Sequence, residues 1–146
     1  GVKLKHSANQ SVVRGARIIL IDDSVVRGTT SKKIVQLMYD AGAREVHMRI
    51  SSPPITHPDY YGIDTPSKTD LLAANHTLEE MRAYMGATSL AFLSIGGIYR
   101  AMGFDRRDAT LPQFTDHCFT GEYPTGLVDQ NGRGTPRQLS LLTEVS

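Results

Sequence analysis

The chain has 146 residues and a formal net charge of +1, from 16 basic and 15 acidic side chains. This length supports one domain with a hydrophobic core. The balanced charge excludes an overall electrostatic field that would attract nucleic acid or an anionic membrane. Its one cysteine, Cys118, excludes an internal disulfide and, with five scattered histidines, forms no zinc-ligand spacing, so a reducing, cytoplasmic setting is expected. No apolar run reaches the roughly 20 residues of a membrane helix, and no signal pattern opens the chain.

The first predicted unit is a buried strand followed by a helix. Residues 18–21 form a short apolar run rich in isoleucine, which is typical of a strand covered on both faces in a parallel sheet and should end at Asp22. Apolar side chains recur with helical spacing over residues 34–41. Thr30 or Ser31 is the expected N-terminal cap of this helix.

A second strand completes the unit. Gly42 is the expected C-terminal cap of the helix, and residues 45–50 alternate between apolar and polar side chains, which predicts a half-exposed strand. Strand, helix and strand at this spacing form a βαβ unit with a right-handed crossover. The pattern therefore predicts an α/β fold built on a parallel sheet.

Turn and capping signals predict the elements that follow. Residues 51–67 hold four of the seven prolines and cannot form a regular helix, so a long loop is expected there. Ser67 with Asp70 fits the capping-box pattern and predicts a short helix. Thr77 with Glu80 fits the same pattern and predicts a second one. The remaining expected features are the end of that helix at Gly86, a strand at 90–93, and a helix at 95–102 that ends at Gly103.

Two regions are expected along the chain, residues 1–103 and an irregular C-terminal extension at 104–146, which is rich in glycine, proline and threonine. The chain begins at Gly1 rather than at a methionine, and its first elements are strand-like, so we expect a piece of a longer protein. A chain that lacks part of its sheet would expose apolar strand edges and would need a partner.

The most informative stretch is residues 17–35, "RIILIDDSVVRGTTSKKIV". Ligands of open α/β sheets bind outside the carboxyl ends of the strands, where helix N-termini also point. The backbone N–H groups and hydroxyls of residues 24–30 can therefore surround a phosphate. Asp22 and Asp23 would repel that phosphate unless they face sugar hydroxyls or a divalent cation such as Mg²⁺. The combination indicates a phosphorylated sugar with a metal, although either aspartate taken alone could simply cap a turn.

This stretch resembles the phosphoribosyl pyrophosphate signature of type I phosphoribosyltransferases. The longer text "LIDDSVVRGTTSKKIVQLMYDAGAREVHMRISSPPITHPDYYGIDTP", with "GATSLAFLS" at residues 86–94, is similar to the glutamine phosphoribosylpyrophosphate amidotransferases. The resemblance covers residues 2–126 and only the C-terminal part of such an enzyme. It implies an incomplete type I phosphoribosyltransferase (Rossmann-like) fold, in which residues 1–103 are the C-terminal part of the phosphoribosyltransferase domain.

The resemblance also implies roles for individual residues. The acidic pair matches the family's residues that bind the ribose hydroxyls and the associated Mg²⁺, and the loop after it matches the loop around the 5′-phosphate. "GVKLKHSANQ" resembles the end of a mobile loop that closes over the pyrophosphate, where Lys3 and Lys5 could contact phosphates or could simply be solvated. The implied substrate-binding residues are Asp22, Asp23, Ser24, Val25, Val26, Arg27, Gly28, Thr29, Thr30 and Lys5, and the implied metal ligands are Asp22 and Asp23.

The sequence departs from the family at the positions of a cofactor. One branch of the family holds an iron–sulfur cluster partly by a cysteine in the proline-rich loop and by a Cys-x-x-Cys before "FTG", and these positions read Asp59, Thr115 and Cys118 here. One thiolate cannot hold a cluster that needs four cysteines, so no iron–sulfur cluster is expected. Cys118 is predicted to be a buried, apolar-like residue. The residues of the proline-rich loop expected in the core or an interface are Tyr60, Tyr61 and Ile63.

The implied function is that of an amidophosphoribosyltransferase of purine synthesis, a glycosyltransferase that forms 5-phosphoribosylamine, glutamate and pyrophosphate from phosphoribosyl pyrophosphate and glutamine. Ammonia attacks C1 of the sugar, so no side chain of this segment need act as a nucleophile. The implied partners are purine nucleotide effectors, an N-terminal glutaminase part outside this chain, and further copies in a homo-oligomer, with neither nucleic acid nor membrane. The segment alone is expected to be inactive in the glutamine-dependent reaction.

Two alternatives stay open. A salvage or pyrimidine type I phosphoribosyltransferase shares the acidic pair and the Gly-Thr-Thr turn, although "SPPITHP" and "YGIDTP" speak against it. A non-catalytic regulator of the same fold could bind nucleotides or RNA, although the net charge of +1 offers no basic stripe for RNA.

Overall fold

The computed structural model describes residues 8–62 and 65–125, so the predicted phosphate contacts Lys3 and Lys5, and also Ile63, lie outside the described residues. The elements in chain order are α2 (Gln10–Val13), β1 (Arg17–Asp22), α3 (Thr29–Asp40), β2 (Glu45–Ile50), the 3₁₀ helix η1 (Lys68–Asp70), α4 (Leu72–Asn75), α5 (Leu78–Met85), β3 (Ser89–Phe92), α6 (Ile95–Ala101) and α7 (His117–Thr120). Every helix among the described residues is too short or too polar to cross a membrane.

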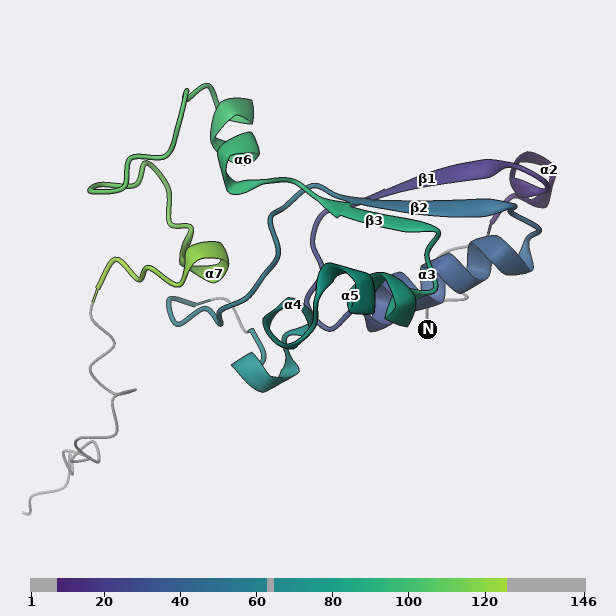
Figure 1. The fold of residues 1–146 in the computed structure, drawn as a ribbon, viewed down its shortest axis with the longest axis horizontal. Coiled ribbons are helices and arrows are strands. Elements are labelled where there is room, and N and C mark those ends of the chain that lie inside the picture. Colours follow the sequence, from purple (N-terminus) through teal and green to yellow (C-terminus); the bar gives the residue numbers. More distant parts are fainter. Residues whose placement is uncertain (1–7, 63–64, 126–146) are drawn as a thin grey trace, which may run out of the picture.

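The centre of the fold is a three-stranded parallel sheet in the order β1-β2-β3. The register pairs Leu20 of β1 with Met48 of β2, and Met48 with Leu90 of β3, so these side chains lie on one face. Helices α3, α4 and α5 lie together beside that face (Figure 1), and the apolar side chains between the two layers form the core. The structure thus confirms the predicted α/β class and the parallel βαβ unit.

Among the described residues no helix covers the other face of β1, which corrects the prediction that the first strand is covered on both faces. The side chains of Ile19 and Ile21 on β1 are 65% and 77% exposed. Beside them on β2, Glu45 Oε2 accepts hydrogen bonds from Arg17 at 2.7 Å and bonds His47 at 2.9 Å. The two exposed isoleucines form an apolar surface on this face of β1, while the expectation of exposed strand edges and a covering partner stays a prediction.

Helix α3 begins earlier than its apolar pattern predicts. Its first residue is Thr29 and its N-cap is Gly28, which has a left-handed φ of 71° and no side chain to cap with. The predicted capping by Thr30 or Ser31 is therefore wrong. At the C-terminal end of α3, Gly42 follows the last turn with a left-handed φ of 94°, which agrees with the predicted glycine cap.

The two predicted capping boxes have different outcomes. Ser67 makes no capping bond, and the segment after it is only the three-residue η1 followed by the short α4. Thr77 does cap α5, because its hydroxyl accepts from the Glu80 N–H while the Glu80 carboxylate accepts from the Thr77 N–H at 2.7 Å. Gly86 ends α5 in the left-handed conformation, as predicted.

Replacing Thr77 with alanine should lower the free energy of unfolding by about 1 kcal/mol, because the hydroxyl satisfies a backbone N–H at the start of α5. The hydrogen bonds from Thr77 also hold the pKa of Glu80 below its ordinary value. A depressed carboxyl pKa stabilises the fold above the unfolded pKa and loses this effect as the pH falls through the folded pKa. Urea unfolding at pH 7 and at pH 3 should therefore reveal a smaller penalty at pH 3. Thr77→Ser, which keeps the hydroxyl, is the control; an equal loss in both variants would contradict the cap.

The described residues after α6 return to the proline-rich loop instead of running away from it. Cys118 O accepts backbone hydrogen bonds from Thr56 at 2.9 Å and from His57 at 3.1 Å, and the Tyr123 hydroxyl donates to Pro58 O at 2.8 Å. Between residues 104 and 125 the chain forms one short helix, α7. The division of the chain at residue 103 stays a prediction.

Candidate functional site

The acidic pair lies where parallel strand β1 ends. Asp22 is the last residue of the strand and is half-buried, and its backbone O accepts from the Ser51 N–H at 2.9 Å. Each carboxylate uses one oxygen to hold the next backbone N–H: Asp22 Oδ1 accepts from Asp23 at 3.1 Å, and Asp23 Oδ1 accepts from Ser24 at 2.6 Å. These bonds orient the carboxylates while leaving lone pairs for an outside donor or a cation.

The loop after the pair is anchored at its centre. Val25 is 1% exposed and belongs to the core under the sheet. Val26 O accepts a hydrogen bond from the Leu72 N–H at 2.9 Å, which ties the loop to the start of α4. Arg27 reaches Asp70 at 3.8 Å, but both side chains are more than half exposed, so this ion pair contributes little. The backbone of the loop is thus fixed by Val25 and Val26.

A pocket of about 320 Å³ is lined by the continuous run of residues 22–31. It opens at the N-terminus of α3, whose first intrahelical bond runs from Lys32 N–H to Gly28 O at 2.9 Å. The N–H groups of the preceding helical residues have no intrahelical acceptor, and the helix dipole places partial positive charge there. Such a pocket suits a phosphate, and the carboxylates at its other end suit hydroxyls or a hard cation.

Gly28 is the residue on which the shape of this pocket depends. A Cβ added there would lie 2.6 Å from Leu72 Cδ2 and 3.2 Å from Tyr84 Cε1. Helices α4 and α5 therefore approach the loop so closely that only glycine fits. Lys32 adds to this support, because its Nζ lies 4.7 Å from the centre of the Tyr84 ring.

Gly28→Ala should destabilise the protein by about 2 kcal/mol, since a left-handed alanine is strained and the new methyl group overlaps Leu72. It should also weaken phosphate binding, because relief of the overlap displaces the loop. Thermal unfolding and phosphate-ester binding by calorimetry are the measurements. Gly15→Ala is the matched control, since Gly15 has a φ of 73° and no atom within 4 Å of the added Cβ. Equal effects of the two substitutions would show that the contact with Leu72 is unimportant.

The structure brings nine of the ten predicted substrate-binding residues to this single pocket, and the tenth, Lys5, is outside the described residues. Sequence reasoning missed Ser31, which also lines the pocket and is 3% exposed. It missed Leu72 and Tyr84 as well. No local signal identifies that pair, because both reach the loop from helices more than 40 residues along the chain.

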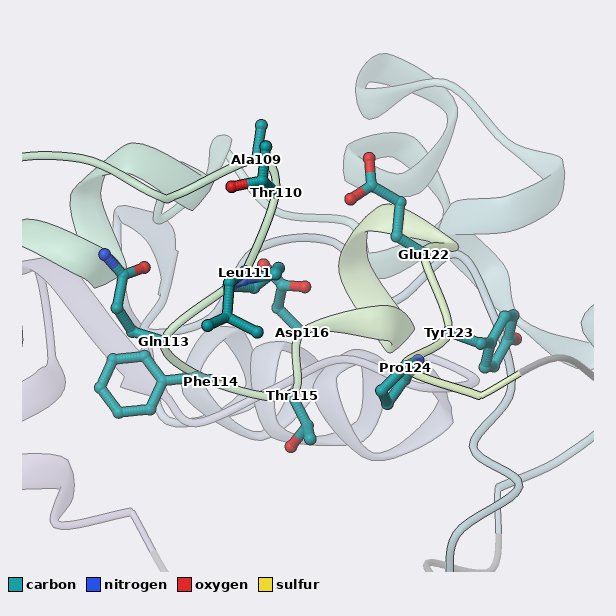
Figure 2. Close-up of a pocket in the computed structure, with 11 residues that line it drawn as sticks. Ala109, Thr110, Leu111, Gln113, Phe114, Thr115, Asp116, Glu122, Tyr123 and Pro124 are labelled. Carbon is teal, nitrogen blue, oxygen red and sulfur yellow. The ribbon is translucent and has the colours of Figure 1, made fainter.

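A second pocket, of about 430 Å³, lies between residues 109–116 and residues 122–124. Figure 2 shows Glu122 at one end of it, Tyr123 and Pro124 on one side, and Leu111 beside Asp116 at its centre. Its lining mixes apolar and polar side chains. Neither a glycine-rich turn nor a helix of eight residues or more borders it. Its residues therefore do not form an anion site like the one at the start of α3.

Asp116, which lines this second pocket, is the centre of a hydrogen-bond network. Its carboxylate accepts from Arg107 Nε at 2.5 Å and from the Tyr99 hydroxyl at 2.8 Å, and it is 5% exposed. Burial alone would raise the pKa of Asp116, but the hydrogen bonds from Arg107 and Tyr99 outweigh it and hold the pKa below its ordinary value. Arg107 also bonds the exposed Glu122 at 2.6 Å. Both Asp116 oxygens accept hydrogen bonds within this network, which points to a structural role.

The structure also places the residues of the proline-rich loop. Tyr60 and Tyr61 are 42% and 45% exposed, so they are not core residues. They contact the returning chain instead, with Tyr60 5.4 Å from the ring of Tyr123 and Tyr61 5.0 Å from that of His117. Cys118 is half-buried rather than fully buried, and burial with the nearby Asp59 raises the pKa of its thiol. A raised thiol pKa agrees with the predicted low reactivity.

Comparison with known proteins finds matches that share one name, although no family model matches the chain. The chain is 59% identical over 143 residues to an amidophosphoribosyltransferase of Rhizobium etli, which covers 97% of this chain and 29% of the relative. It is 50% identical over 125 residues to the amidophosphoribosyltransferase of Bacillus subtilis, covering 86% of this chain and 26% of the relative. The chain thus spans less than a third of the length of these relatives.

Solved structures agree with the sequence comparison. The glutamine phosphoribosylpyrophosphate amidotransferase of B. subtilis, in a complex with ADP and GMP, superposes with a TM-score of 0.77 at 47% identity, covering 85% of this chain and 27% of that one. A structure described as the allosteric regulatory enzyme of purine biosynthesis gives a TM-score of 0.76 at 47% identity, over 85% of this chain and 26% of that one. The chain matches only about a quarter of each solved structure, which agrees with a sheet that has apolar side chains exposed on one face.

Proposed function

The chain belongs to the amidophosphoribosyltransferase family as a segment of its phosphoribosyltransferase fold, and on that premise we propose that it carries the phosphoribosyl-binding part of such an enzyme. The whole polypeptide would form 5-phosphoribosylamine, glutamate and pyrophosphate from phosphoribosyl pyrophosphate and glutamine. The observation that carries the proposal is the pocket of residues 22–31, which has two carboxylates at one end and a helix N-terminus at the other.

The phosphate end of the pocket binds the 5′-phosphate of the sugar. Backbone N–H groups at the start of α3 and the hydroxyls of Ser24, Thr29 and Thr30 donate hydrogen bonds to its oxygens. Gly28 lets the chain turn into the helix without a side chain in the way. Val25 and Val26 contribute through their backbone, which the core and Leu72 hold in place.

The acidic end binds the ribose. Asp22 and Asp23 would accept hydrogen bonds from its hydroxyls and would hold the associated Mg²⁺, since carboxylates suit this hard cation. Bound Mg²⁺ would neutralise charge on the departing pyrophosphate. The two carboxylates also place fixed negative charge near C1, where positive charge develops in the transition state. Orientation and electrostatics are the contribution of this segment, and ammonia is the nucleophile.

The remaining parts of the reaction lie in the longer polypeptide. Its glutaminase part supplies ammonia, and Lys5 belongs to the pyrophosphate side of the site. We further propose a cytoplasmic homo-oligomer regulated by purine nucleotides, as the ADP and GMP complex of the B. subtilis relative suggests. The exposed Ile19 and Ile21 support a covering partner, which the rest of the chain provides. The isolated 146-residue segment is inactive with glutamine.

Turnover of the intact polypeptide tests the proposal. With phosphoribosyl pyrophosphate and Mg²⁺, it should release pyrophosphate when glutamine or ammonia is added and should not do so with free purine or pyrimidine bases. Release that depends on a base would instead establish a salvage or pyrimidine phosphoribosyltransferase. Absence of release under all these conditions would leave a binding module and overturn the proposed activity.

A further inference from the structure

Three side chains outside the phosphate pocket bring metal-binding atoms together. One donor atom each of Asp59, His117 and Cys118 lies within 4.8 Å of the other two. Asp59 is 8% exposed and His117 is 5% exposed, while Cys118 is half-buried. Oxygen, nitrogen and sulfur donors in one buried place form a ligand set typical of zinc.

The surrounding backbone holds this cluster in position. Cys118 O accepts from both Thr56 and His57, which fixes the proline-rich loop against α7. The ring of His57 packs directly on Gly121, where an added Cβ would lie 2.7 Å from its Nε2. The cluster therefore joins two segments that are about 60 residues apart in sequence, and its donors are positioned before any ligand arrives.

The two ring nitrogens of His117 have different surroundings. Nε2 contacts the Asp59 carboxylate, and Nδ1 is buried without a hydrogen-bond partner among the described residues. Nδ1 can carry the proton of a neutral ring, which leaves the Nε2 lone pair available to a cation beside Asp59. The rings of Tyr61 and Tyr123 lie 5.0 Å and 5.2 Å from the ring of His117 and limit the approach of solvent. The partial shielding of Asp59 and His117 from bulk water strengthens their attraction for a cation.

We propose that Asp59, His117 and Cys118 bind one divalent transition-metal ion, with Zn²⁺ the best match to their donor atoms. Donor atoms around tetrahedral zinc are about 3.4 Å apart for metal–ligand bonds near 2.1 Å, so a small adjustment of the three side chains accommodates the ion. The ion replaces the proton between Asp59 and His117 and the proton of the Cys118 thiol, and these protons pass to solvent. A water molecule completes four ligands. The site holds a single ion, because an iron–sulfur cluster needs more cysteines.

This inference is independent of the proposed enzymatic function, because its ligands come from the proline-rich loop and α7 and not from the loop of residues 22–31. The competing explanation is that Asp59 and His117 form only a structural ion pair. The two explanations differ in the role of Cys118, which an ion pair does not need and a metal site does.

Cobalt spectroscopy of the intact, metal-free polypeptide tests the site. Addition of Co²⁺ should produce the visible bands of a tetrahedral site and a thiolate-to-cobalt charge-transfer band, and both should saturate at one ion per chain. Cys118→Ser should abolish the charge-transfer band and weaken binding at least about tenfold. His47→Gln is the matched control, because His47 forms a similar contact with Glu45 at 2.9 Å without a cysteine. It should leave the spectrum unchanged.

The same experiment can overturn the proposal without reference to catalysis. A charge-transfer band of equal intensity in wild type and Cys118→Ser would place the cobalt elsewhere. The absence of any saturable band in wild type, in a protein with an unchanged circular dichroism spectrum, would leave Asp59 and His117 as a structural ion pair. Zn²⁺ should displace Co²⁺ from the site with loss of the bands, and failure to do so would also contradict it.

Discussion

Replacing Asp22 and Asp23 together with asparagine is expected to abolish phosphoribosyl transfer in the intact polypeptide, with kcat/KM reduced at least about 10³-fold. Asparagine keeps the size and the hydrogen bonds that each carboxylate accepts from the next N–H group. It removes the charges that we propose hold Mg²⁺ and stabilise the positive centre at C1. The loss should therefore appear in catalysis with little change in stability.

The ammonia-dependent and glutaminase assays separate this effect from unfolding. Glutaminase turnover should persist in part, because the proposed glutaminase part lies outside this segment. Asp40→Asn is the control, since Asp40 is an exposed carboxylate at the far end of α3 that bonds only Gln36 among the described residues. It should leave transfer unchanged. Full ammonia-dependent activity in the double variant would exclude the acidic pair from the reaction.

Asp116→Asn should have the largest effect on stability, about 3–5 kcal/mol locally, because it leaves Arg107 without its buried partner. The Arg107 side chain is only 15% exposed, and the Asp116 side chain is 6% exposed. Hydrogen exchange should become about 10²-fold faster or more in α7 and in the proline-rich loop that α7 holds. The loop of residues 22–31 should keep its protection against hydrogen exchange, since it packs on a different part of the core.

Glu122→Gln provides the matched control for this prediction. Glu122 bonds the same guanidinium at 2.6 Å, but its side chain is 61% exposed. Its loss should cost less than about 1 kcal/mol, because water replaces an exposed partner. If the two substitutions accelerate exchange equally, burial of the pair is not what stabilises α7.

The elements that the sequence predicted well are those whose signal is local. The isoleucine run before Asp22 and the alternation in residues 45–50 identify both strands of the βαβ unit within one or two residues. The Thr77 capping box and Gly86 bound α5 because both act within one turn of the helix. The place of the pocket of residues 22–31 was predictable for the same reason, since all its lining comes from one continuous run; its role in phosphate binding stays a prediction.

The predictions that failed depend on contacts between distant segments. Residues 18–21 were predicted to be covered on both faces because all four are apolar, but the side chain of Ile19 is 65% exposed and that of Ile21 is 77% exposed. The start of α3 is set by the approach of Leu72 to Gly28, not by a hydroxyl cap. The resemblance placed Asp59 and Cys118 where one branch of the family has cluster cysteines, but His117 was missed, because only the return of the chain to the proline-rich loop unites the three side chains.

The most direct test of the central claim is a crystal structure of the intact polypeptide with phosphoribosyl pyrophosphate and Mg²⁺. The 5′-phosphate should accept hydrogen bonds from the backbone N–H groups at the start of α3, with the ribose hydroxyls against Asp22 and Asp23. Density for the sugar phosphate in another place, with the pocket of residues 22–31 filled only by water, would contradict the assignment.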